Sequence, residues 1–332
     1  MEDGVFLYKM TPSSLTALLH LDKKEGEFVV KGQEEQRISR RKKPWLQKKD
    51  LIGWLIMLPA ILLFAFFVWE PILESVRLSM HSAKGFRTEE FVRFDNYIRL
   101  FQYPVFLKAL KNTVEYIFWS LIIGFFTPMI LAILITETVH GKSFFKIGIY
   151  FPNIIPGLAT VLMWRYLFGE GKTGVINILL SYIGIEPQVW LNNTMLTIPL
   201  ITIILTWKGA GATALIYIAN ISNIDPALYE AATIDGSSPL KRIRYITLPS
   251  IFSLGKMMLI LQIISVFQIL YEPLVLKNGG PNNASISIMM LVWNYANRNM
   301  DYPMAAATSV VICVILIIFS GLYFKLTKTK EA

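Results

Sequence analysis

The chain has 332 residues, of which 54% are hydrophobic and only 17% charged, whereas about 25% of a typical soluble domain is charged. Six long stretches contain one charged residue at most, and a soluble fold could not cover that much apolar surface. One cysteine, Cys313, and three scattered histidines exclude a disulfide framework and predict no metal site. We therefore expect an all-α, polytopic membrane protein.

The first 48 residues are polar and contain a basic run from Arg37 to Lys43. No apolar segment precedes this run, so it does not have the pattern of a cleaved signal peptide. We interpret residues 1–48 as a loosely ordered cytoplasmic tail and residues 49–332 as the transmembrane domain.

Six membrane-spanning helices are predicted, since each apolar stretch has about the length that a helix needs to cross a ~30 Å hydrocarbon core. Helices also satisfy their own backbone hydrogen bonds in lipid. The predicted spans are residues 51–70, 112–136, 146–168, 195–221, 250–272 and 302–324.

The orientation of these spans follows from Lys and Arg. Segments on the side of the N-terminus carry fifteen basic residues, whereas the longer segments on the other side carry nine. Basic residues are retained in the cytoplasm, so both termini and the loop 223–249 are predicted to be cytoplasmic.

The loop 223–249 has the pattern of two short helices joined by a tight turn. Asp225 followed by Pro226 is a typical helix start, Gly236 suits the left-handed residue that ends a helix, and Ser238-Pro239 begins a second helix. Glu230 is placed to pair with a basic residue of another protein. The other interpretation is an amphipathic helix resting on the membrane surface.

This loop resembles the EAA loop of ABC importer permeases. Glu230-Ala231-Ala232, Gly236, Ile246 and Leu248-Pro249 match its spacing without a gap, and Tyr229 to Gly236 is similar to the carbohydrate-importing branch. Further similarity covers roughly residues 51–325. It is carried by Phe94-Asp95-Asn96-Tyr97, Asn112-Thr113, Phe151-Pro152, Trp164, Gly174, Asn177, Trp190-Leu191, Gly279-Gly280-Pro281 and Ala305-Ala306-Ala307, and is nearest to the first-permease, maltose-permease-F-like branch.

The resemblance implies a non-catalytic subunit in the inner membrane of a prokaryote. It would pair with a second permease subunit, two copies of an ATPase that uses ATP and Mg²⁺, and an extracytoplasmic solute-binding protein. The chain has no phosphate-binding loop motif of its own and is expected to bind no cofactor. The residues expected to couple it to the ATPase are Tyr229, Glu230, Ala231, Ala232, Asp235, Gly236, Leu248 and Pro249.

The cargo is expected to cross a cavity lined by helices three to six, where polar and aromatic side chains would recognise a sugar. Gln268 and Tyr271 are three residues apart, which would put them on one helix face. The candidate residues are Trp207, Lys208, Tyr217, Asn220, Gln262, Gln268, Tyr271 and Glu272.

Lys208 is a charge in the middle of a predicted span, which costs roughly 2.5–3.5 kcal/mol on insertion scales. Two explanations stay open: it recognises an acidic, uronate-containing oligosaccharide, or it pairs with an acid of the partner permease. Two alternatives for function also stay open, namely the same importer family with a cargo such as glycerol phosphate or peptide, and a gradient-driven secondary transporter.

Overall fold

The computed structural model describes residues 19–20, 29–30, 48–84 and 87–328. The chain divides into two units, residues 1–67 and 68–332. In the first unit, β1 (Leu19–His20) pairs antiparallel with β2 (Val29–Val30), and α2 (Lys48–Phe64) is a helix. The rest of the predicted tail lies outside the described residues.

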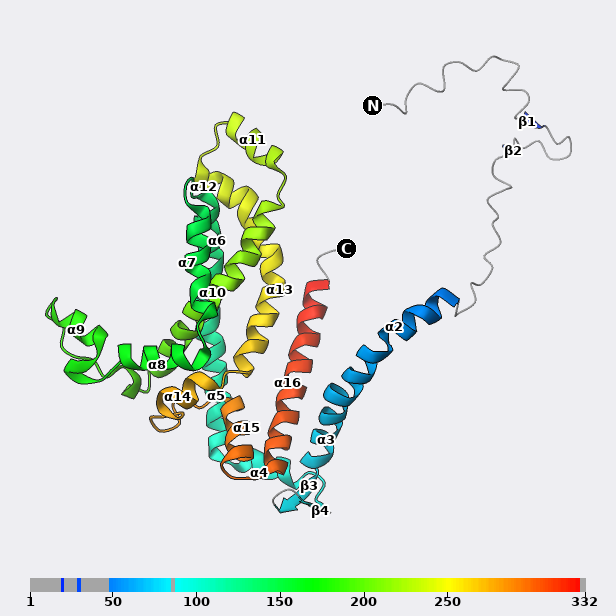
Figure 1. Ribbon diagram of the computed structural model, residues 1–332, viewed down its shortest axis with the longest axis vertical. Coiled ribbons are helices and arrows are strands. Elements are labelled where there is room, and N and C mark those ends of the chain that lie inside the picture. Colours follow the sequence, from blue (N-terminus) through cyan, green and yellow to red (C-terminus); the bar gives the residue numbers. More distant parts are fainter. Residues whose placement is uncertain (1–18, 21–28, 31–47, 85–86, 329–332) are drawn as a thin grey trace. The chain divides into compact units, whose positions relative to one another are not determined.

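The second unit contains one small hairpin and otherwise helices (Figure 1). Its elements, in chain order, are α3 (Glu70–Ser79), β3 (His81–Lys84), β4 (Arg87–Phe91), α4 (Asp95–Gln102), α5 (Pro104–Trp119), α6 (Phe126–Glu137), α7 (Lys142–Ile154), α8 (Gly157–Leu167), α9 (Val175–Ser181), α10 (Thr197–Ser222), α11 (Pro226–Ile234), α12 (Pro239–Arg242), α13 (Leu248–Phe267), α14 (Tyr271–Lys277), α15 (Ile288–Asn297) and α16 (Tyr302–Lys328). Single helical turns η2 (Ser120–Gly124), η3 (Gly171–Thr173), η4 (Trp190–Asn192) and η5 (Ile243–Thr247) lie between them, and η1 (Ala65–Trp69) follows α2 across the boundary of the two units.

Five helical segments of the described residues are long and apolar enough to cross a membrane, and the bent pair α7–α8 would be a sixth if it crosses as one span. The predicted all-α, polytopic membrane fold is therefore confirmed. The five segments are Ile52–Ser79, Pro104–Glu137, Thr197–Ser222, Pro239–Phe267 and Tyr302–Thr327.

The third predicted span, residues 146–168, is not one straight helix. It consists of α7 and α8, which meet at an angle of 96°. Ile155 has an extended backbone, as expected for a residue before proline, and Pro156 lacks the N–H that would continue α7.

The fifth predicted span also ends earlier than expected, at Phe267 rather than at residue 272. Gln268 caps α13, and the chain starts again as α14 at Tyr271. The expectation that Gln268 and Tyr271 share one helix face is therefore wrong, because the helical spacing does not continue through residues 268–270.

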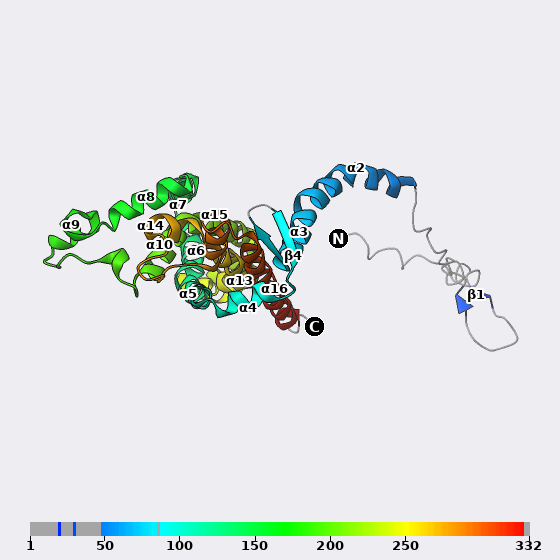
Figure 2. The same cartoon turned by 90° about the horizontal axis from the view of Figure 1, so that it is seen from below.

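Helix α10 is central to the second unit and packs against α5, α6, α7 and α13 (Figures 1 and 2). Its contact with α7 is very close: a Cβ atom at Gly211 would lie 1.8 Å from the carbonyl oxygen of Ile149. Small residues let two helix backbones approach in this way.

Polar side chains of α5 fasten it to the loop before α15. The Asn112 amide donates to the carbonyl oxygens of Asn283 and Ile286, at 2.8 and 2.9 Å. The Tyr116 hydroxyl donates to the Ser285 carbonyl oxygen at 2.9 Å. These buried bonds hold α5 in place where it forms a wall of the cavity described below.

Candidate functional site

The loop between α10 and α13 folds as its sequence predicts. The Asp225 carboxylate accepts a hydrogen bond from the Ala227 amide at 2.9 Å, and Pro226 opens α11. Gly236 ends the helix with a φ of 72°, where its amide donates to the Thr233 carbonyl at 3.0 Å. Glycine adopts this left-handed conformation without the steric cost that a Cβ atom brings.

Two side-chain contacts fasten α11 to the helix that follows it. The Arg242 guanidinium donates to the Thr233 hydroxyl at 2.8 Å, and the Tyr229 and Thr247 hydroxyls lie 2.8 Å apart. Pro249 lies in the first turn of α13, where a missing N–H breaks no helical hydrogen bond. These contacts join α11 to α12 and η5, and η5 leads directly into α13.

The outer surface of α11 and α12 is exposed. No residue of either helix is buried, and Ile234 and Leu240 expose 87% and 77% of their surface. Glu230 is exposed, and in the described part of the chain it forms no ion pair. Exposed apolar side chains next to an unpaired charge are typical of a surface that contacts another protein.

Of the other residues expected to couple here, Ala231 is exposed and Ala232 is half-buried. Asp235 caps the end of α11, and Leu248 is the first residue of α13. All eight predicted residues thus lie on this loop or on its junction with α13, and their role in coupling stays a prediction.

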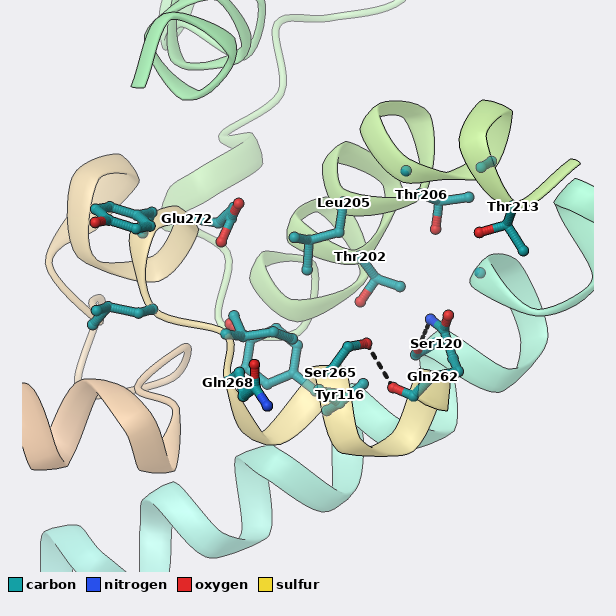
Figure 3. A pocket seen from close by; sticks show the side chains of 17 residues that line it. Tyr116, Ser120, Thr202, Leu205, Thr206, Thr213, Gln262, Ser265, Gln268 and Glu272 are labelled. Atoms are coloured by element: carbon teal, nitrogen blue, oxygen red, sulfur yellow. Dashed lines mark hydrogen bonds between the residues drawn. The ribbon is translucent and has the colours of Figure 1, made fainter. Parts of the chain in front are cut away.

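A cavity of about 420 Å³ lies between α5, η2, α10, α13 and α14 (Figure 3). Four of the eight predicted cargo residues line it, and they all come from the end of α13 and the start of α14. They are Gln262, Gln268, Tyr271 and Glu272.

Gln262 connects two walls of this cavity. Its side-chain amide donates to the Ser120 hydroxyl at 2.5 Å, and its main-chain carbonyl oxygen accepts from the Ser265 hydroxyl at 2.7 Å (Figure 3). A Cβ atom at Gly124 would lie 2.9 Å from the Gln262 amide nitrogen. The glycine in η2 therefore makes room for this contact.

Among the described residues that line the cavity, Glu272 is the one with a charged side chain. Burial raises the pKa of its carboxyl group, and a hydrogen bond from its own backbone and the positive charge of Lys208 oppose that rise. Gln268 and Tyr271 are exposed, so the cavity offers amide groups and an aromatic ring to a ligand. Amides and aromatic faces are groups to which sugar hydroxyls and sugar rings bind.

The other four predicted cargo residues do not line this cavity. Trp207 packs edge-on against Trp164, with ring centres 5.7 Å apart. Tyr217 is fully buried in a cluster with Met129. Asn220 accepts a hydrogen bond from the Ser250 hydroxyl at 3.0 Å.

Lys208, the fourth of these residues, reaches the break between α7 and α8. Its ammonium group donates to the Ile155 carbonyl oxygen at 2.8 Å. Ile155 lies between the two helices, as the residue that follows α7 and precedes Pro156. Lys208 therefore joins α10 to the backbone at the break between α7 and α8.

Sequence reasoning missed the hydroxyl-bearing wall of the cavity. Thr202, Thr206 and Thr213 of α10 line it together with Tyr116 and Ser120. The three threonines are four and seven residues apart, which places them on one helix face. That spacing could have predicted the wall, but threonines in an apolar segment are less conspicuous in a sequence than a charged residue or a tryptophan.

Residues 140–328 match the family described as the binding-protein-dependent transport system inner membrane component. The lactose transport system permease protein LacF of Rhizobium radiobacter is 31% identical over 85% of this chain and 96% of its own. The arabinooligosaccharides transport system permease protein AraP of Bacillus subtilis (strain 168) is 29% identical over 84% of this chain and 89% of its own.

The fold is also similar to solved structures. A chain of a bacterial ABC transporter involved in the import of the acidic polysaccharide alginate matches with a TM-score of 0.75 and 26% identity, over 86% of this chain and 98% of that one. A chain of the same kind of transporter, in complex with an alginate pentasaccharide-bound periplasmic protein, matches with a TM-score of 0.72.

Proposed function

This chain belongs to the family of binding-protein-dependent transport system inner membrane components, and we propose that it is one membrane-spanning permease subunit of an ATP-driven importer. Its cargo is a sugar or oligosaccharide, delivered by a solute-binding protein outside the cell membrane. The chain itself is not an enzyme. The observation that carries this proposal is the loop 223–249, whose exposed helix α11 is hydrogen-bonded to α12 and η5, the turns that lead into the membrane helix α13.

The cavity supports a sugar as the cargo. It is lined by threonine and serine hydroxyls, two glutamine amides and the ring of Tyr271. Curated relatives carry names such as the arabinooligosaccharides, lactose and trehalose/maltose transport system permease proteins. The names of these three relatives refer to carbohydrates, and the lining is compatible with the same class of cargo.

In this proposal α11 lies in the cytoplasm and docks into an ATPase subunit. Glu230 pairs with a basic residue of that ATPase, while Ala231 and Ala232 allow close packing. Two ATPase copies bind ATP and Mg²⁺, and a second permease subunit completes the pathway. The ATP-bound ATPase must favour one arrangement of α13 over the other, since a partner shifts a conformational equilibrium only through differential contact.

Co-purification of the ATPase tests the docking role. We expect Glu230→Lys to reduce the amount of ATPase that remains bound to the purified permease pair, because it places like charges together. Glu137→Lys is the matched control, since Glu137 is an exposed carboxylate at the end of α6. Equal loss of the ATPase in both variants, or in neither, would contradict the docking role.

Uptake by reconstituted vesicles tests the cargo class. We expect transport of oligosaccharides that depends on ATP and on a binding protein, and no transport of peptides or glycerol phosphate. Uptake that a proton gradient drives in the absence of ATP would instead indicate a secondary transporter.

A further inference from the structure

A groove between α13 and α16 has no part in the cargo pathway proposed above. Its volume is about 560 Å³, and Lys256 and Lys325 line it from opposite helices. The Tyr323 hydroxyl donates to the Lys256 carbonyl oxygen and so joins the two helices at this point. Ser253 and Thr327 add two more hydroxyl groups to the lining.

The groove collects positive charge. None of the described residues that line it is acidic. Lys256 lies within the apolar segment Pro239–Phe267, and in the described part of the chain its ammonium group has no ion-pair partner. A lysine within a membrane span is costly unless it pairs with an anion or reaches a polar surface. The ammonium group of Lys256 therefore offers a place for an anion.

The surroundings of the groove show what kind of anion can reach it. Met257 and Phe324 also line it, and 64% and 60% of their surfaces are exposed. Both belong to segments that are apolar enough to cross a membrane, so these exposed side chains face acyl chains or another membrane helix. An anion at this depth is most readily supplied by a molecule that is itself part of the bilayer.

We propose that this groove binds the headgroup phosphate of an anionic phospholipid. Lys256 pairs with the phosphate, and the Ser253 hydroxyl donates a hydrogen bond to a phosphate oxygen or to the headgroup, whereas the Thr327 hydroxyl donates to the Tyr323 carbonyl oxygen at 2.7 Å. The acyl chains lie along Met257 and Phe324. Basic pockets between membrane helices are known to hold anionic headgroups, and this groove has the charge, hydroxyl groups and apolar rim for such a ligand.

Native mass spectrometry of the assembled transporter tests the proposal. The purified complex is titrated with phosphatidylglycerol and, separately, with phosphatidylcholine. We expect preferential binding of phosphatidylglycerol, weakened about fivefold by Lys256→Met, since each lysine near a membrane contributes about 1 kcal/mol. Lys256→Arg should retain binding, because it keeps the charge.

Lys146→Met is the matched control, since Lys146 lies on α7 and outside the groove. Equal affinity for both lipids, or an equal effect of Lys146→Met and Lys256→Met, would overturn the proposal. Methionine is favourable at a lipid-facing position, so loss of folding is not expected, and the thermal unfolding midpoint of each variant checks this.

A second measurement separates a lipid from a protein occupant. A cysteine introduced by Met257→Cys is cross-linked in membranes, in a background carrying Cys313→Ser. We expect no cross-link to the second permease subunit. An efficient cross-link to that subunit would show that the groove is an interface between the two permeases, and the lipid proposal would be wrong.

Discussion

At the scale of single residues, the charged side chain of Lys208 binds a backbone carbonyl of this chain rather than a ligand. A charged mid-span side chain suggests cargo recognition, but the Lys208 ammonium group lies on the Ile155 carbonyl oxygen. A hydrogen bond from a charged donor contributes about 1.5–3 kcal/mol. We infer that Lys208 positions α8 and does not itself select an acidic sugar.

Lys208→Met should therefore lower the uptake of neutral and acidic oligosaccharides by the same factor. The loss of about 1.5 kcal/mol at the α7–α8 break would lower the population of the native arrangement about tenfold relative to displaced ones. Lys208→Arg, which can still donate to Ile155, should retain most of the activity. A selective loss of acidic cargo in Lys208→Met would instead support the acidic-sugar hypothesis.

Glu272 gives a prediction for pH. Because burial raises the pKa of its carboxyl group, the folded state binds this proton more tightly than the unfolded state does. The contribution is stabilising below the usual pKa of 4.5 and is lost as the pH rises through the raised value. Glu272→Gln should reduce the loss of thermal stability between about pH 4 and about pH 8.

The control for this experiment is Glu186→Gln, since Glu186 is exposed in the loop after α9. Its melting temperatures should follow the same pH dependence as those of the unmodified protein. A Glu272→Gln variant with an unchanged pH profile would show that this carboxyl group does not contribute to it.

At the scale of helices, the central feature is the close approach of α10 and α7. The backbones meet at Gly211, where any side chain would collide with the Ile149 carbonyl oxygen. Gly209, two residues earlier, has no atom within 4 Å of a Cβ position. Close packing therefore requires a glycine at position 211 but not at position 209.

Gly211→Ala should destabilise the fold by about 1–3 kcal/mol, since overpacking forces helices apart. Gly209→Ala should leave stability unchanged or raise it, because alanine favours a helix by about 1 kcal/mol over glycine. Thermal unfolding of the two variants in the same detergent measures the difference, and similar midpoints would contradict the close packing at Gly211.

The helices also show which parts of the site a sequence can predict. Asp225, Pro226 and Gly236 correctly predicted the short helix α11, because helix caps and turns depend on residues that are neighbours in the sequence. The breaks at Ile155 and Gln268 were missed, since an apolar run looks the same whether its helix is straight or broken. The threonine face of α10 was missed because only tertiary packing shows which face lines a cavity.

At the scale of the whole molecule, the predicted order of spans agrees with the structure, and the orientation of the chain stays a prediction. Within the residues that the structure describes, five segments have the length and apolarity of spans, or six with the bent pair. The basic residues place the loop 223–249 and the N-terminus on the same side. This orientation is required if α11 is to meet an ATPase in the cytoplasm.

Cysteine labelling in intact cells tests this orientation. In a Cys313→Ser background, Ser181→Cys at the end of α9 should react with a membrane-impermeant maleimide. Ser237→Cys, in the turn after α11, should react only after the membrane is permeabilised. The opposite pattern would place α11 outside the cell and contradict the coupling role.

The bond between Lys208 and Ile155 also has a consequence for biogenesis. The two residues are 53 positions apart in the chain, and a ribosome adds about 5–20 residues per second. For some 3–10 seconds after α7 and α8 are synthesised, the Ile155 carbonyl therefore has no Lys208 ammonium group to bind. The break between α7 and α8 is therefore expected to stay without this hydrogen bond until α10 has been synthesised.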